Sequence, residues 1–161
     1  MLDIAYLFMT GFVSGAIAGT TMGGLADAWG RKKMCLIFCL TSSISLFLRV
    51  VTISFPILFV SHLLSGLSAG LLFSVFETWL VAEYQNLGLP SRLLDRLFAT
   101  ATFGNGLCAI FAGIVANWAV DSLGIQAPFI VAIGFLAMGA LLISVLWNEN
   151  YGISDGKVCD A

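Results

Sequence analysis

The chain has 161 residues, of which 60% are hydrophobic and only 10% charged, and its mean hydropathy is +1.02. Soluble domains carry about 25% charged residues, so this composition excludes a water-facing globular surface and predicts a chain that lies in a lipid bilayer. The net charge is −2, and since the sequence has one cationic cluster and no basic stripe, we expect no nucleic-acid partner.

Residues that carry catalysis are scarce, with four cysteines and one histidine in the chain. Cys35 and Cys39 lie one helical turn apart in an apolar run, so we interpret them as small core residues. The sequence shows no metal-ligand spacing and no nucleophile paired with a base. We therefore expect neither an enzyme nor a bound metal or cofactor.

Five apolar stretches approach or exceed the roughly 20 residues that a helix needs to cross the hydrocarbon. Turn residues separate them, with Pro56 in the second link and Gly88 and Pro90 in the third. The sequence predicts an all-α membrane protein with five transmembrane helices, followed by a solvated linker over residues 148–161. The predicted spans are 4–25, 34–53, 57–81, 97–120 and 127–147.

The cations predict an orientation. If the spans alternate in direction, six of the seven Lys and Arg residues fall at one end of the bundle, and Arg49 alone falls toward the other. Cytoplasmic loops collect Lys and Arg, so we expect the N-terminus outside, the C-terminus in the cytoplasm, and residence in the plasma membrane. An odd number of spans with this orientation suggests a further segment before Met1. The six cations are Arg31, Lys32, Lys33, Arg92, Arg96 and Lys157.

The first span carries glycine at every fourth position. Steps of four residues advance by about 40° around a helix, so these glycines share one face. Small residues at this spacing let a neighbouring helix approach closely, either as a fixed packing seam or as a surface on which a moving helix glides. The four glycines are Gly11, Gly15, Gly19 and Gly23.

The segment GGLADAWGRKK (residues 23–33) interrupts the apolar pattern with glycines, a carboxylate and three consecutive cations. Two glycines allow a tight reversal between helices, and Asp27 can pair with Arg31 four residues later. The segment resembles the signature loop G-x-L-a-D-r-x-G-R-(K/R)-(K/R) of the major facilitator superfamily, with Ala28 where an arginine is frequent. The residues that match are Gly24, Leu25, Asp27, Gly30, Arg31, Lys32 and Lys33.

The resemblance implies a fold and a gate. The five spans would be helices two to six of an N-terminal six-helix half, and the segment would be the cytoplasmic gating loop that latches the two halves of a transporter together. Because such transporters bind substrate between two halves, we expect the missing first helix and second half to be required for transport. The chain would be a fragment, a truncated gene model, or a short protein that needs a partner.

The third span holds a stripe of polar and small residues, His62, Gly66, Gly70, Ser74 and Glu77, all on one helix face. A carboxylate within a span usually faces the bundle interior, so Glu77 is a candidate coupling residue, with an interfacial snorkelling residue as the alternative. His62 occupies the arginine position of the superfamily's R-x-x-x-G pattern. It is either a candidate site residue that titrates near neutrality or a hydrogen-bonded interfacial side chain.

Two further residues complete the candidate pathway. Asn105 lies in the fourth span between Gly104 and Gly106, where it can bond a substrate or a neighbouring helix. Arg49 lies near the outer end of the second span, where it can bind an anion or extend its charge into water.

Three strings resemble the eukaryotic molybdate-anion transporter family of this superfamily: FETW (76–79), ATFGN (101–105) and residues 128–152, with the ending WNENY. The resemblance implies a secondary active transporter that takes up the small anion molybdate by alternating access. Transport of another small solute such as a sugar or drug, or a half-size membrane partner that does not transport, remain the alternatives.

Overall fold

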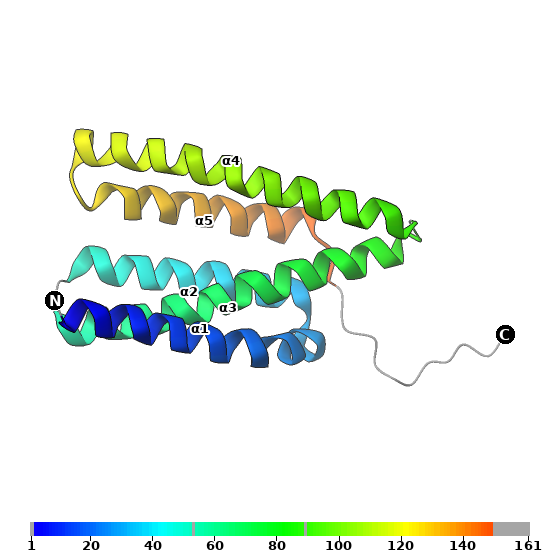
Figure 1. Cartoon of the computed structure of the whole chain (residues 1–161), viewed down its shortest axis with the longest axis horizontal. Helices are drawn as coiled ribbons and strands as arrows, with labels where there is room; N and C mark the ends of the chain where they lie inside the picture. Colours follow the sequence, from blue (N-terminus) through cyan, green and yellow to red (C-terminus); the bar gives the residue numbers. More distant parts are fainter. Residues whose placement is uncertain (1, 53, 89, 150–161) are drawn as a thin grey trace.

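The computed structural model describes residues 2–52, 54–88 and 90–149. The described chain is all-α, and the five helices are long and apolar enough to cross a membrane by length and composition. Successive helices run antiparallel (Figure 1), which confirms the predicted fold class. The helices are α1 (Leu2–Trp29), α2 (Arg31–Val51), α3 (Phe55–Asn86), α4 (Ser91–Leu123) and α5 (Ala127–Leu146).

Most helices run past the predicted spans, because a helix continues through polar residues that an apolar count leaves out. The clearest case is α1, which extends through Gly23, Gly24 and Asp27 to Trp29. The prediction of a loop reversed by two glycines is therefore wrong in this respect. Gly24 is helical, and the reversal between α1 and α2 falls on Gly30 alone.

The helices α1 and α3 form the closest packing in the molecule, because glycines let their backbones approach. A Cβ added to Gly15 would lie 3.2 Å from the carbonyl oxygen of Gly66, and one added to Gly70 would lie 2.7 Å from the amide nitrogen of Gly19. At Gly66 an added Cβ would collide with the Gly11 carbonyl. Gly23 lies outside this contact, with nothing within 4 Å of its Cβ position.

Hydroxyl groups join α2 to α3. The Ser45 hydroxyl donates to the Ser61 carbonyl at 2.8 Å, and the Ser61 hydroxyl donates to the Ser45 carbonyl at 2.9 Å. About two helical turns after Ser61 on α3, the Ser68 hydroxyl donates to the Thr41 hydroxyl at 2.8 Å. Such bonds satisfy polar groups that lipid cannot, and thereby fix the register of the two helices.

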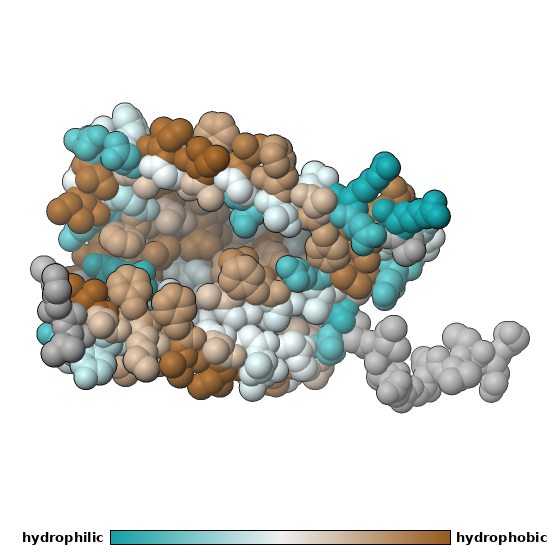
Figure 2. All heavy atoms as spheres, viewed as in Figure 1, coloured by the Kyte–Doolittle hydropathy of each residue, from teal (hydrophilic) through white to brown (hydrophobic). Residues whose placement is uncertain are grey.

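The helices α1, α2, α3 and α5 share a small apolar core. Cys35 and Cys39 are buried in it together with Val75 and Ile143, as expected for core cysteines. By contrast, α4 packs mainly against α5, and no part of the apolar stretch that makes α4 a candidate membrane span is buried. Figure 2 shows the resulting hollow between the α4–α5 pair and the other helices.

Candidate functional site

The turn between α1 and α2 consists of a single residue. Gly30 has φ 103° and ψ 129°, a backbone conformation that side chains with a Cβ rarely adopt. Its amide donates to the Ala26 carbonyl at 3.1 Å and its carbonyl accepts from the Met34 amide at 3.2 Å. The backbone hydrogen bonds of α1 therefore continue into α2 through Gly30, and the chain changes direction there with almost no loop.

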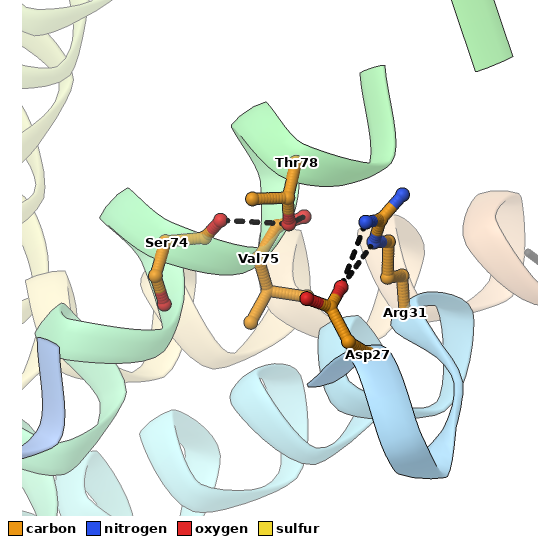
Figure 3. Close-up of polar contacts among 5 residues, drawn as sticks. All are labelled: Asp27, Arg31, Ser74, Val75 and Thr78. Atoms are coloured by element: carbon orange, nitrogen blue, oxygen red, sulfur yellow. Dashed lines mark hydrogen bonds and ion pairs between the residues drawn. The ribbon is translucent and has the colours of Figure 1, made fainter. Parts of the chain in front are cut away.

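The predicted pair of Asp27 and Arg31 spans this turn. The Arg31 Nη2 and Nε atoms donate to one Asp27 oxygen at 2.7 and 3.0 Å. The Arg31 side chain is 12% exposed while that of Asp27 is 48% exposed, so the pair bridges protein and solvent. Figure 3 shows it beside the turn of α3 that carries Val75 and Thr78.

A carboxylate from the far end of the chain caps α2. The Lys32 amide donates to Glu149 Oε1 at 2.9 Å, which satisfies one of the free amides at the start of the helix. A negative charge is also favourable at a helix N-terminus. The carboxylate fits because residue 30 is glycine, since a Cβ there would lie 2.6 Å from the same oxygen.

The cap is reciprocal. The Lys32 side chain reaches back to the end of α5, where its Nζ donates to the Ser144 carbonyl at 2.9 Å. Carbonyls in the last turn of a helix lack partners, and a cation there is favourable. Thus α2 receives its N-terminal anion from beyond α5, and α5 receives its C-terminal cation from α2.

Aromatic rings hold the same segment against α3. The rings of Trp79 and Trp147 stack with centroids 3.7 Å apart and an interplanar angle of 12°, and Phe76 contacts Trp147 edge to face at 5.7 Å. The Trp79 indole donates to the Asn148 carbonyl at 3.1 Å. We call Gly30, Lys32, Trp79, Trp147 and Glu149 the clasp.

Glu149 was predicted to lie at the start of a linker, and its role as a cap was not predicted. A signal was present, because α2 follows a glycine that has no side chain with which to cap it, and three cations follow in sequence. Nothing local indicated that the missing carboxylate would come from 117 residues away. The remaining predicted linker, residues 150–161 with Lys157, lies outside the described residues.

A second candidate site lies at the opposite end of α1, α2 and α3. Here a cavity of about 280 Å³ brings together Arg49 from α2 with His62 and Ser65 from α3. Apolar walls come from α1, through Phe8 and Phe12. We call this cavity the Arg49 pocket. It unites two of the four residues predicted for a substrate pathway.

The polar groups of the Arg49 pocket are only partly satisfied. Arg49 Nε donates to the Ser61 hydroxyl at 2.9 Å, which holds the half-buried guanidinium against α3. Within the described part of the chain, the terminal nitrogens of Arg49 and the Ser65 hydroxyl have no hydrogen-bond partner. Unpaired donors beside a fixed positive charge suit an anionic ligand, which accepts several short hydrogen bonds.

A second cavity of about 360 Å³ adjoins the first, sharing Ser65 and Ala69. It extends along α2 and α3 past Ser42, Ser45 and Ser68 to Ala132 on α5. The polar surface of the Arg49 pocket therefore continues toward the middle of the helices as a row of hydroxyls.

The other two candidate pathway residues lie elsewhere. Glu77 is exposed on α3, near the clasp end and outside the Arg49 pocket. Asn105 is exposed on α4, which packs against α5 and does not reach the pocket. The predicted stripe on α3 is therefore divided: Gly66 and Gly70 face α1, whereas Glu77 points away from the packed interior.

Comparison with known proteins supports a transporter. A major facilitator superfamily (MFS) family model, described as sugar transporters with 12 TM, matches residues 1–160. The chain is 34% identical to the molybdate-anion transporter of Xenopus tropicalis and 35% identical to that of Xenopus laevis, in each case over 98% of this chain and 36% of the relative. The Takifugu rubripes protein of the same name is 34% identical over 92% of this chain and 31% of its own length. No solved structure matches.

The arrangement of apolar helices and these matches define a multi-pass integral membrane protein of the transporter class. The chain belongs to this MFS family, which is also the family of its molybdate-anion transporter relatives. Members of the family are transporters rather than enzymes, as the sequence predicted. The chain spans about a third of the length of the curated relatives it matches.

Proposed function

We propose that the chain forms part of a secondary active transporter that takes up a tetrahedral oxyanion, molybdate, by alternating access. The Arg49 pocket would bind the anion, and the clasp would hold the opposite end closed. The observation that carries the proposal is the donor set of the pocket, in which the terminal nitrogens of Arg49 and the Ser65 hydroxyl have no partner among the described residues and line one cavity without a carboxylate.

The description of the matching family model favours a second candidate, a sugar. A neutral sugar is bound by many directed hydrogen bonds, whereas a fixed guanidinium adds most to the binding of a charged oxyanion. The fixed charge of Arg49 therefore favours a small anion over a neutral sugar.

The charge distribution supports a direction for the clasp. Arg31, Lys32, Lys33, Arg92 and Arg96 lie at the clasp end, and Arg49 lies at the other. By the positive-inside rule, we propose that the clasp faces the cytoplasm and the Arg49 pocket faces outward, in the plasma membrane. Substrate would then enter at the pocket, and release would follow when the clasp opens.

Uptake of labelled molybdate by cells expressing the full-length gene tests the proposal. Arg49→Ala removes a charge-assisted bond worth about 1.5–3 kcal/mol, so the apparent affinity should fall roughly tenfold to a hundredfold. Asn105→Ala, outside the pocket, is the matched control and should transport like the wild type. Uptake no greater than that of vector-only cells would remove molybdate as the substrate, and uptake of labelled sugar instead would favour the second candidate.

A further inference from the structure

We propose that His62 makes anion binding at the Arg49 pocket depend on a proton, because this imidazole can donate to an oxyanion only when it is doubly protonated. The inference rests on the proposed function of the pocket as an oxyanion site. It adds a chemical condition to that function, namely that one proton binds with each anion.

The hydrogen bond of His62 fixes its tautomer. The Nδ1 atom lies 2.9 Å from the Leu58 carbonyl oxygen, one turn earlier in α3. A carbonyl oxygen only accepts hydrogen bonds, so Nδ1 must carry a hydrogen and donate it. In the neutral ring Nε2 then has a lone pair and no hydrogen.

A neutral His62 therefore opposes an oxyanion. Its remaining nitrogen would place a lone pair toward the oxygen lone pairs of the ligand. Protonation at Nε2 reverses this, because the imidazolium donates through Nε2 while Nδ1 keeps its bond to Leu58. The pocket then holds two cations, Arg49 and His62, with the unpaired Ser65 hydroxyl between the two cavities.

Among the described residues, the lining of the Arg49 pocket contains no acid that would hold the imidazolium without a ligand. Facing His62, α1 places the ring of Phe8 in a T-shaped contact with centroids 5.8 Å apart, and α2 places Arg49. The titratable residues of α1 at this end are Asp3 and Tyr6; neither lines the Arg49 pocket, and Tyr6 lines a separate cavity. Two cations in one pocket repel each other, and an oxyanion between them relieves the repulsion. Proton and anion binding therefore favour each other by the same factor.

The step involves only a proton and hydrogen bonds. A proton from the water at the pocket end adds to the Nε2 lone pair of His62. The new N–H donates to an oxyanion oxygen, and no covalent bond to the ligand forms. When the anion leaves, the repulsion from Arg49 returns and Nε2 releases the proton to water.

Calorimetric titration of the purified protein expressed from the full-length gene, in lipid nanodiscs, tests the inference. Sulfate, whose charge stays constant over the range, and dilute molybdate are the probes, from about pH 5 to about pH 8, where histidines titrate. Because binding requires the imidazolium, the apparent affinity of the wild type should fall as the pH rises, by up to about tenfold per pH unit. Buffers of different ionisation enthalpy should report close to one proton taken up per anion.

Two variants make the result decisive. His62→Arg supplies a permanent cation, so binding should persist and lose its pH dependence. His62→Gln supplies no cation, so binding should be weaker and equally independent of pH. A flat wild-type profile, or a pH dependence that survives either substitution, would overturn the role of His62 while leaving the oxyanion site in place. Absence of binding in both the wild type and His62→Arg at every pH would instead remove the proposed function of the pocket, and this inference with it.

Discussion

The two ends of the α1–α3 pair use their polar groups in opposite ways. At the clasp end, the charged and polar groups bond to each other: Glu149 caps α2, Lys32 caps α5, and Asp27 pairs with Arg31. At the other end, Arg49 has one bond through Nε to Ser61, and the Ser65 hydroxyl has none within the described residues. The first end is closed by its own side chains, whereas the second has donors left for a ligand.

The difference shows how one bundle can combine a gate with a binding site. Groups that satisfy each other stabilise one conformation, and they release it only when several bonds break together. Groups without partners in a low-dielectric setting favour binding, because the ligand supplies the bonds they lack. Variants that affect one end and not the other therefore test whether the two ends act separately.

The largest effect is expected at the close contact between α1 and α3, because both the clasp end and the pocket end depend on it. A Cβ at Gly66 would collide with the Gly11 carbonyl. Because that carbonyl belongs to the backbone of α1 and cannot rotate away as a side chain can, α1 and α3 would have to move apart. Gly66→Ala should therefore destabilise the chain by about 3 kcal/mol or more, with both the clasp and the pocket lost. Thermal unfolding in detergent and oxyanion binding would measure this.

Gly23→Ala is the matched control for Gly66→Ala, because nothing lies within 4 Å of its Cβ position. It replaces a helical glycine by alanine without a collision and should be neutral or slightly stabilising. Equal stability of the two variants would contradict the close packing of α1 and α3.

A smaller effect, confined to the clasp end, is expected for Gly30→Ala. The backbone at φ 103° would be strained by about 1–3 kcal/mol with a side chain present, and the Cβ would displace the Glu149 carboxylate. We expect a lower melting temperature with unchanged oxyanion affinity. Gly24→Ala, in open space on α1, should show neither change, and a loss of affinity in Gly30→Ala would show that the ends are not independent.

Removing only the charge of the cap should have a still smaller effect. Glu149→Gln keeps an oxygen for the Lys32 amide but loses the interaction with the helix N-terminus, which is worth about 0.3–1 kcal/mol. Glu149→Ala also loses the hydrogen bond and should be less stable than Glu149→Gln. Melting temperatures in the order wild type, Gln, Ala would support the cap, and three equal values would argue that Glu149 caps nothing.

The smallest effect is expected at Glu77. The sequence made this carboxylate a candidate coupling residue, but it is exposed on α3 and outside the Arg49 pocket. Glu77→Gln should leave the oxyanion affinity within about twofold of the wild type, since no ligand contact is lost. A larger loss, measured by calorimetry beside Asn105→Ala, would place Glu77 in binding after all.

The number and type of helices followed from the sequence, because apolar runs of this length have few alternatives in lipid. The Asp27–Arg31 pair was predictable because its two residues are only four positions apart, so they stay close on either side of the turn at Gly30. Glu149 was not, because its bond to α2 depends on how α5 packs against α2. Glycine periodicity predicted a seam on α1 but not its extent, since where Gly23 leaves the contact depends on the angle at which α3 crosses.

Two of the polar residues that line the Arg49 pocket could be predicted from the sequence, and a third could not. Arg49 and His62 stand out as rare ionisable groups within apolar spans, and the antiparallel link between α2 and α3 brings them to the same end. Asn105 stands out equally by sequence, yet α4 packs mainly along α5 and contributes no residue to the lining of the pocket. Ser65 gave no signal, because serines that bond within their own helix look the same in sequence as serines that lack a partner.

Protection of an introduced thiol tests most directly whether an oxyanion occupies the Arg49 pocket. Ser65→Cys would be made in a chain whose Cys108, exposed on α4, and Cys159 are replaced by serine, with Glu77→Cys as the matched control. We expect molybdate to slow modification of Cys at position 65 by a charged thiol reagent, in a concentration-dependent manner, and Arg49→Ala to abolish this protection, while position 77 shows none. Equal modification rates at position 65 with and without molybdate would show that the anion does not occupy the Arg49 pocket.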